Sequence, residues 1–555
     1  MALPLSPTSH VDTFARDHLP PAGQWPVIEF TTPELTYPAR LNAAAELIDA
    51  AVERHGPGRP ALRTPAGEVW AYGDLRTRAN QVARVLTEDL DLVPGQRVLL
   101  RAPNNPWAVA CWLGVLKAGG VVVTTMAALR AREIVPVAER TRPSVALVDH
   151  RFTEDVHTVR DTALPGLRVV AYGGTGADDL VTRCAAKPGE FTAVDTAADD
   201  VALLGPTSGS TGVPKITMHF HRDILSIDNT FARHVLRLRP DDVVACTAPF
   251  AFTFGLGMLV VFPLRAGACA LLTETATPAR LADLVEKHGV TVLATAPTAY
   301  RAITRDGRVR QLAGLRVGVS AGEHIPLSLW EELRDRIGLK VIDGIGATEL
   351  LHIFLSAAGD DIRPGATGRP VPGYRATILG FDGRELGPGE PGRLGVIGPV
   401  GCRYLDDRRQ QDYVVDGWNV TGDIFHRDED GYFYYHARSD HMIVSSGYNI
   451  GGPEVEAAID THPDVVESAV VARPDPERGS VVCAFVVLRE GVTGGPAKAK
   501  EIQDHVKQVL APYKYPRDVR FHDVLPRNTS GKLQRFALRK IIEAEQAAEQ
   551  REELP

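Results

Sequence analysis

Cysteine is scarce in this chain of 555 residues, and its placement follows no pattern. The six cysteines show no CxxC spacing, so they form no recognisable metal or redox motif. They are expected to be small buried residues in a reducing compartment. The cytoplasm is therefore the predicted location.

Long apolar runs and a surplus of positive charge are also missing. The longest apolar stretch, residues 255–272, is interrupted by Pro263 and Arg265, which favours a buried strand and helix over a membrane span. The first residues have neither the basic nor the apolar region of a secretory signal. With 61 Lys and Arg against 69 Asp and Glu, the net charge of −8 argues against general affinity for nucleic acids or anionic membranes. Neither is expected as a partner.

What the chain does contain is an alternation of short β-rich runs and helical stretches. Residues 97–102 and 119–125 have the pattern of strands around a helix at 107–117, and a helix at 279–288 precedes an apolar strand at 290–294. Such alternation predicts parallel sheets covered by helices on both faces, with sites at the carboxyl ends of the strands.

The pattern changes twice in the second half of the chain. Beyond residue 363, turn residues such as Asp382-Gly383 separate short strands, which indicates an antiparallel, barrel-like part. After residue 438, helices at 454–460 and 497–510 mix with strands at 468–471 and 481–488. We therefore predict an α/β protein with a large N-terminal domain, residues 1–439, and a small α+β C-terminal domain, residues 440–555.

The first chemical signal is the nonapeptide TSGSTGVPK at residues 207–215. Its hydroxyls and glycines let backbone N–H groups approach a phosphate closely, and Lys215 supplies a positive charge for the outer phosphates. No GK[ST] follows the glycines, so this is not a Walker loop. Composition alone also fits a flexible linker. The strand-like residues 201–204 and the closing Pro214-Lys215 favour a phosphate-binding loop instead.

Four further motifs follow in order along the chain. They are GATE at 346–349, TGD at 421–423, RSD at 438–440 and PRNTSGK at 526–532. Together with the nonapeptide they resemble the signatures of the adenylate-forming superfamily, which includes acyl- and aryl-CoA ligases, adenylation domains and luciferases. Each motif is weak alone, whereas all five in the same order over most of the chain are specific.

The resemblance implies a reaction in two steps. A carboxylate attacks the α-phosphorus of ATP to give an acyl-adenylate and pyrophosphate, and the thiol of CoA then takes the acyl group. Because carboxylate and ATP are both anions, catalysis rests on positioning and on neutralising charge. The resemblance also implies that the C-terminal domain is mobile, that it turns about Asp440, and that Mg²⁺ accompanies ATP.

Roles for single residues follow from the same resemblance. Lys532, Thr348 and Glu349 are implied to be catalytic. Lys532 bridges the attacking carboxylate and the α-phosphate, Thr348 donates to the α-phosphate, and Glu349 holds Mg²⁺ through oxygen. Asp423, with Arg438 nearby, is implied to accept the ribose hydroxyls. The implied ATP-binding residues are Thr207, Ser208, Gly209, Ser210, Thr211, Gly212, Lys215, Ala321, Gly322, Glu323, Asp343, Gly344, Ile345, Gly346, Asp423 and Arg438.

Three segments narrow the class of acid. Residues 344–354 resemble benzoate-type CoA ligases, and residues 251–257 and 10–17 are similar to 2-aminobenzoate–CoA ligases. Aromatic and small side chains suit a flat ring better than an alkyl chain, although core packing explains any single phenylalanine equally well. The implied acid-binding residues are Phe252, Thr253, Thr298, Ala321, Ile345, Gly346 and His352. We predict an AMP-forming aryl-acid CoA ligase for a 2-aminobenzoate-like acid.

Three positions depart from the family pattern. Ile345 stands where an adenine-stacking aromatic residue is usual, Phe252 where a histidine is common, and Val444 where many relatives have lysine. The last departure weakens the assignment of thioester-forming contacts. Gly447 and Tyr448 nevertheless match the family's loop beside the CoA channel.

Two alternative functions stay open. A stand-alone adenylation enzyme that loads a carrier protein shares the same motifs. A serine hydrolase is suggested by GVSAG at residues 318–322, which matches the GxSxG elbow around Ser320. An elbow needs a helix directly after the serine, however, and Pro326 predicts a later helix start.

The remaining features give no further site. His219 and His221 lie two residues apart without a third ligand cluster, and we interpret them as structural. The expected partners are thus an aromatic acid, ATP and CoA. The oligomeric state is open, a homodimer included.

Overall fold

The computed structural model describes residues 5–207, 214–322, 325–438, 442–445, 448–475, 478–510, 514–527 and 533–552. The chain divides into two compact units. The first comprises residues 1–376 and 395–420, and the second comprises residues 377–394 and 421–555. The predicted domain boundary between residues 439 and 440 falls outside the described residues and stays a prediction.

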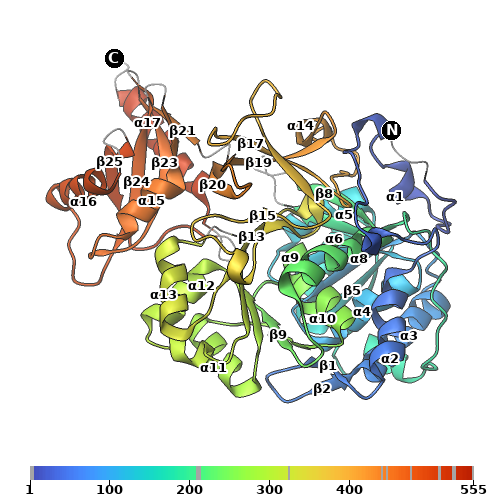
Figure 1. Ribbon diagram of the computed structural model, residues 1–555. Helices are drawn as coiled ribbons and strands as arrows, with labels where there is room; N and C mark the ends of the chain where they lie inside the picture. Colours follow the sequence, from blue (N-terminus) through green and yellow to red (C-terminus); the bar gives the residue numbers. More distant parts are fainter. Residues whose placement is uncertain are drawn as a thin grey trace. The chain divides into compact units, whose positions relative to one another are not determined.

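One sheet of the first unit has six strands in the order β6-β5-β3-β4-β7-β8. Figure 1 labels its strands β5 and β8. Strands β6 to β7 are parallel, and β8 runs antiparallel to β7. Every residue of β3 and β5 is buried, as expected of strands covered on both faces. The strands are β3 (Arg97–Ala102), β4 (Val121–Met126), β5 (Val145–Asp149), β6 (Arg168–Tyr172), β7 (Val201–Thr207) and β8 (Lys215–Phe220).

The second sheet of this unit has nine strands in the order β15-β14-β13-β12-β11-β9-β10-β1-β2. Its centre, from β1 to β13, is parallel, and β2, β14 and β15 pair antiparallel at the two edges. The strands are β1 (Pro60–Arg63), β2 (Val69–Ala71), β9 (Val243–Cys246), β10 (Cys269–Leu271), β11 (Val292–Thr295), β12 (Val317–Ser320), β13 (Ile342–Gly346), β14 (Ile353–Ser356) and β15 (Arg369–Pro370).

Helices connect these parallel strands, and their ends follow local capping rules. The Asn105 side chain accepts a hydrogen bond from Ala108 N–H and Pro106 opens α4, whose faces are buried nearly all round. Thr277 caps α11 in the same way, and Gly289 ends it in the left-handed region (φ 62°). The helices of this unit are α1 (Phe14–Asp17), α2 (Ala50–His55), α3 (Tyr72–Arg84), α4 (Pro106–Lys117), α5 (Ala131–Thr141), α6 (Thr153–Thr162), α7 (Leu180–Ala185), α8 (His221–Ile227), α9 (Thr253–Leu256), α10 (Phe262–Ala266), α11 (Pro278–His288), α12 (Pro297–Arg305), α13 (Leu327–Ile337) and α14 (Gln410–Tyr413).

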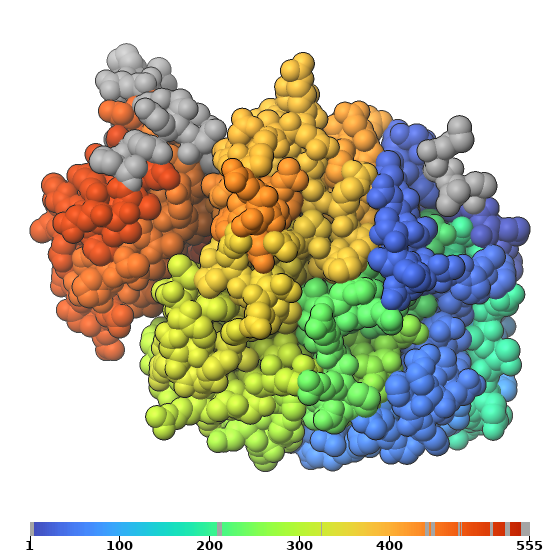
Figure 2. Space-filling model, in the orientation of Figure 1, coloured from blue at the N-terminus to red at the C-terminus, as the bar shows by residue number. Residues whose placement is uncertain are grey.

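Segments far apart in the sequence lie side by side in the first unit. Ile28 forms a bridge with Gly398, and Val27 N–H donates to the carbonyl O of Gly417 at 2.8 Å. The space-filling view shows the blue N-terminal segment against the gold and orange segment near residue 400 (Figure 2). The segment around Val27 and Ile28 therefore packs against the segment that follows residue 395.

A further sheet has five strands. Its order is β16-β17-β19-β18, and β20 pairs with β19. Strand β19 is antiparallel to both β18 and β20, as the turn residues beyond residue 363 predicted. The strands are β16 (Arg375–Leu379), β17 (Gly392–Ile397), β18 (Val414–Val415), β19 (Trp418–Arg427) and β20 (Phe433–Arg438).

The second unit contains a three-stranded sheet with helices on both faces. Val470 of β23 packs with residues of α15 and α16, whereas its neighbours Ala469 and Val471 pack with Leu538 and Ile542 of α17. This alternation is the ordinary two-residue period of a strand. The elements are β21 (Met442–Ser445), β22 (Tyr448–Gly451), α15 (Gly452–Asp460), β23 (Val465–Asp475), β24 (Gly479–Leu488), α16 (Pro496–Val509), β25 (Asp518–Phe521) and α17 (Arg535–Glu552).

The predicted fold class is confirmed. Parallel sheets with helices, an antiparallel part and a small α+β segment are all present in the predicted order. The six cysteines are buried and free, as expected. Among the described residues, no helix is long and apolar enough to cross a membrane.

Candidate active site

Glu349 is placed by a tight connection between two neighbouring strands near one edge of the nine-stranded sheet. Strands β13 and β14 pair antiparallel, and between them one turn of 3-10 helix, Thr348–Leu350, is followed by Leu351 in the left-handed region (φ 66°). Gly346 allows the chain to pass, because a Cβ there would lie 2.7 Å from the carbonyl O of His352. The connection buries Glu349, which is 6% exposed.

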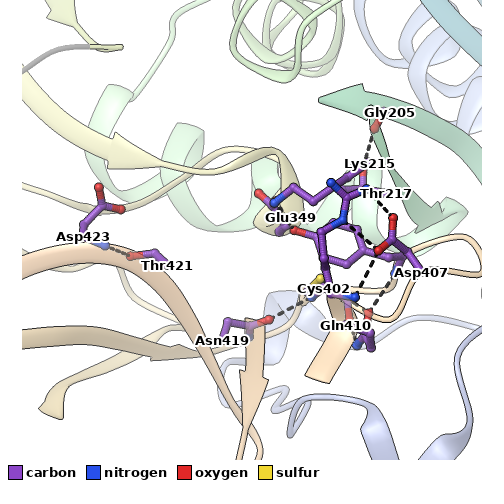
Figure 3. A network of polar contacts seen from close by, with 12 residues as sticks. Gly205, Lys215, Thr217, Glu349, Cys402, Asp407, Gln410, Asn419, Thr421 and Asp423 are labelled. Atoms are coloured by element: carbon purple, nitrogen blue, oxygen red, sulfur yellow. Dashed lines mark hydrogen bonds and ion pairs between the residues drawn. The ribbon is translucent and has the colours of Figure 1, made fainter. Parts of the chain in front are cut away.

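Lys215 and Glu349 lie close to one another (Figure 3), and Tyr404 completes a compact polar cluster with them. Lys215 Nζ lies 2.7 Å from Tyr404 Oη and 3.2 Å from Glu349 Oε1. Tyr404 Oη also donates to Glu349 Oε1. Burial, and then the Glu349 carboxylate, raises the pKa of the Tyr404 phenol far above its ordinary value, so the phenol keeps its proton.

The cluster is held by the segment that follows strand β17. Tyr404 N–H donates to Gln410 Oε1 at 2.9 Å, and Gln410 Nε2 donates in turn to the carbonyl O of Cys402 at 3.1 Å. From helix α5, Arg140 donates to the carbonyl O of Pro214 at 2.5 Å and pairs with Asp407 at 3.1 Å. These contacts tie the start of β8, and so Lys215, to the same segment.

A buried ion pair lies next to this cluster in the sequence and in space. Arg403 Nη1 is 2.9 Å from Asp223 Oδ2, and both side chains are completely buried. His219, also fully buried, lies within 3.0 Å of the Thr217 hydroxyl, and Thr217 donates to the carbonyl O of Gly205 at 3.1 Å. Burial lowers the pKa of His219 to about 4, so its imidazole is neutral near pH 7. This environment supports the interpretation of His219 as structural.

A recess opens beside the cluster at the carboxyl ends of β4 and β7. It has about 260 Å³ of empty space, its mouth included. Two of the predicted acid-binding residues, Phe252 and Thr253, line it together with the predicted catalytic Thr348. The lining residues are Thr124, Leu203, Gly205, Pro206, Ala251, Phe252, Thr253, Leu256 and Thr348.

The other predicted acid-binding residues do not line this recess. Thr298 is exposed, Ile345 and Ala321 are half-buried, and Gly346 is exposed at the end of β13. His352 is 2% exposed and lies among phenylalanines, with its ring stacked on Phe254 at a centroid distance of 5.6 Å. Burial lowers its pKa to about 3. Acid contacts from these positions stay predictions.

The predicted ATP-binding residues of the first unit that the structure describes lie in or next to strands β7, β8, β12 and β13. Thr207 and Lys215 face each other as a pair of the β7–β8 ladder. Asp343 and Gly344 are buried in β13, and Gly322 adopts the left-handed region (φ 91°) just after β12. Residues Ser208, Gly209, Ser210, Thr211, Gly212 and Glu323 lie outside the described residues.

In the second unit, Asp423 and Arg438 are brought together. They are cross-strand partners of β19 and β20, and Arg438 Nη1 lies 3.2 Å from Asp423 Oδ1. The same nitrogen donates to the carbonyl O of Thr421 at 3.2 Å. The predicted Lys532, Asp440 and Gly447 lie outside the described residues, as does the side chain of Tyr448.

Two other features of the described residues lack the geometry of a site. Ser320 of the GxSxG match ends β12 completely buried, its hydroxyl has no hydrogen-bond partner among the described residues, and α13 begins only at Leu327. This is not the geometry of a hydrolase elbow. His462, Asp464 and Glu501 gather oxygen and nitrogen atoms within 4.8 Å, but Lys498 pairs with both carboxylates at 2.6 Å. We therefore assign no metal there.

Sequence reasoning missed several residues of the site. Tyr404, Gln410, Thr124 and Leu203 belong to no recognised motif, although Tyr404 follows soon after the end of strand β17 at Ile397. Only one feature of the sequence could have indicated the site residues of β4 and β7: their apolar and hydroxyl side chains lie near the ends of predicted strands. Sites in α/β proteins lie at the carboxyl ends of parallel strands.

Comparison with known proteins places the chain among enzymes. Models described as AMP-binding enzyme and AMP-binding enzyme C-terminal domain match residues 48–403 and 454–532. The benzoate–CoA ligase of Thauera aromatica is 34% identical over 519 residues, which cover 92% of this chain and 98% of that protein. The mitochondrial acyl-coenzyme A synthetase ACSM3 of Pongo abelii is 33% identical over 537 residues, 91% of this chain and 90% of that protein. The crystal structure of the anthranilate CoA ligase AuaEII in complex with anthranoyl-AMP superposes with a TM-score of 0.87 and 30% identity, covering 93% of this chain and 100% of that chain.

Proposed function

Because the chain belongs to the family of AMP-binding enzymes, we propose that it activates an aromatic carboxylate as an aryl-adenylate and transfers the aryl group to CoA. The predicted enzyme class, an AMP-forming acid–CoA ligase that uses ATP and CoA, is confirmed by its relatives. The aromatic substrate is our own assignment, since those relatives include a benzoate ligase, an anthranilate ligase and an acyl-CoA synthetase.

The observation that carries the aromatic assignment is the recess beside Glu349. Its wall includes the ring of Phe252, and its other members are small or aliphatic. One aromatic ring among small and aliphatic side chains suits a flat aromatic acid better than a long alkyl chain. Thr348, next to Glu349 in the sequence, also lines the recess.

Charge in the polar cluster suits MgATP. Glu349 offers a buried carboxylate, a hard oxygen ligand of the kind that Mg²⁺ prefers, and Lys215 beside it offers a cation for the outer phosphates. When bound, Mg²⁺ neutralises phosphate charge as the carboxylate approaches. In this proposal Thr348 donates to the α-phosphate, and Asp423 with Arg438 binds the ribose.

The remaining roles complete the proposal. Lys532 neutralises the acid and the α-phosphate during adenylation, Asp440 is the pivot of the C-terminal domain, and Gly447 and Tyr448 lie beside CoA during thioester formation. We place the enzyme in the cytoplasm, because all six cysteines are free and buried.

The identity of the acid is tested by kcat/KM for 2-aminobenzoate, benzoate, 2-hydroxybenzoate and hexanoate under identical conditions. We expect 2-aminobenzoate to be best, because its ortho amine can bond to its own carboxylate and needs no buried partner. Hexanoate should be poor, since a flat recess leaves its chain badly packed. The variant Phe252→Ala should raise KM for the aromatic acids by losing ring contacts while leaving the ATP requirement intact.

The ranking decides between separate parts of the proposal. Benzoate or 2-hydroxybenzoate at the top would keep the aromatic class and reject the amine. Hexanoate at the top would reject the aromatic class itself. A matched control is Phe354→Leu, because Phe354 is a fully buried phenylalanine of β14 outside the recess and should leave the ranking unchanged.

A further inference from the structure

The phenol of Tyr404 connects two groups of the active site that the motifs treat separately. Lysine has only N–H donors, so the 2.7 Å contact makes Tyr404 Oη the acceptor of a hydrogen bond from Lys215. A carboxylate has only acceptors, so the phenol proton must point at Glu349 Oε1. One hydroxyl therefore fixes the direction of both an ammonium and a carboxylate.

The position of this hydroxyl is set independently of the groups that it holds. Tyr404 is completely buried, its N–H is bonded to Gln410, and its backbone bridges Thr217 of β8. Its ring packs edge-on against Tyr413 at a centroid distance of 6.0 Å. Lys215, by contrast, has a side chain that is 21% exposed. The tyrosine is thus the fixed member of the cluster and the lysine is the one with freedom to turn.

We propose that Tyr404 is a positioning residue for the adenylation step, whose hydroxyl holds Glu349 and Lys215 in the orientation that receives MgATP. This inference rests on the proposed function and assigns a role to a residue outside all five motifs. Glu349 and Lys215 lie 3.2 Å apart and attract each other directly. Without the hydroxyl this existing ion pair keeps its contact but loses the group that fixes its direction, so both side chains can turn away from the positions that receive metal and phosphate.

The test compares the two half-reactions of the Tyr404→Phe variant, which keeps the ring and removes only the hydroxyl. We expect acid-dependent ATP–pyrophosphate exchange to fall about 10- to 100-fold, the range for losing a hydrogen bond to a charged group. More Mg²⁺ should be needed for half-maximal exchange, while KM for the acid changes less than about twofold. Thioester formation from synthetic aryl-AMP and CoA should keep its wild-type rate.

Two controls separate positioning from a general loss of structure. Tyr172 lies on the edge strand β6, and its buried hydroxyl donates to Asn105. Tyr172→Phe removes this hydroxyl and should leave exchange unchanged. In a Glu349→Gln background, adding Tyr404→Phe should cost much less than it does alone, because the group it positions is already lost.

The outcomes are distinct. Exchange within about threefold of wild type, or equal loss in both half-reactions, would overturn the positioning role. A full additional loss in the Glu349→Gln background would overturn it as well. If none of the aromatic acids supports pyrophosphate exchange by the wild-type enzyme, the proposed function is wrong. The role of Tyr404, which rests on that function, is then rejected as well.

Discussion

Replacing Lys532 by alanine is expected to slow adenylate formation by about 10²–10³-fold, the cost of removing one electrostatic contact to a transition state. The attacking carboxylate and the α-phosphate are both anionic, so the lysine matters only while they approach each other. Thioester formation from supplied aryl-AMP and CoA involves no such approach and should be largely spared. Single-turnover measurements of each half-reaction check this directly.

The control for this variant is another lysine of the C-terminal region. Lys540→Ala removes an exposed cation of α17 whose ammonium lies over the ring of Phe536. It should change neither half-reaction. Equal losses in both half-reactions of Lys532→Ala would contradict the assigned role.

Breaking the buried ion pair beneath the site is expected to have the largest effect on stability. Arg403→Met leaves the completely buried Asp223 without its partner, which costs about 3–5 kcal/mol when such a pair is broken. Urea unfolding should show the free energy of unfolding falling by that amount. Arg403 directly precedes Tyr404 of the polar cluster, so its replacement should also disturb that cluster. The rate of adenylation should therefore fall even at temperatures at which the variant is still folded.

A second substitution tests the physical cause. Asp223 also accepts a hydrogen bond from Phe220 N–H at 3.0 Å, so Asp223→Asn removes the charge and keeps an acceptor for the start of α8. The double variant Arg403→Met with Asp223→Asn should regain most of the lost stability. Stability of the double variant as low as that of the single one would show that packing of the arginine stem, not the unpaired charge, dominates.

The sequence predicted those parts of the fold that depend on local periodicity. Residues 97–102 were expected to form a strand and correspond to β3, because a run of buried residues in a parallel sheet has a continuous apolar pattern. The helix after Pro326 also begins where the proline indicates, at Leu327. The helix expected at residues 279–288 begins one residue earlier, at Pro278, because Thr277 caps it.

The site was only partly predictable, for a physical reason. The motifs identified Lys215 and Glu349, which the fold brings to 3.2 Å from one another. Tyr404 could not be found in this way, since its contact with Lys215 spans 189 positions and no short spacing encodes it. Arg403 contradicts the general expectation that charged residues are exposed, and only its partner Asp223 explains its burial.

His352 illustrates a different limit. Its place in the motif predicted a contact with the acid, yet in the structure it is surrounded by Phe231, Phe254 and Phe262. A tight turn between two antiparallel strands does not reveal from sequence which side chain faces a recess and which faces the core. The acid panel therefore also informs whether this buried ring senses the substrate.

The central claim is an AMP-forming transfer of an aromatic acid to CoA, and product analysis tests it most directly. The full-length protein is incubated with 2-aminobenzoate or benzoate, ATP, Mg²⁺ and CoA, and all products are identified by mass spectrometry. We expect aryl-CoA, AMP and pyrophosphate in equal amounts, and none of them when the acid is omitted. Formation of ADP, ester hydrolysis without ATP, or adenylate that passes only to a carrier protein and never to CoA would contradict it.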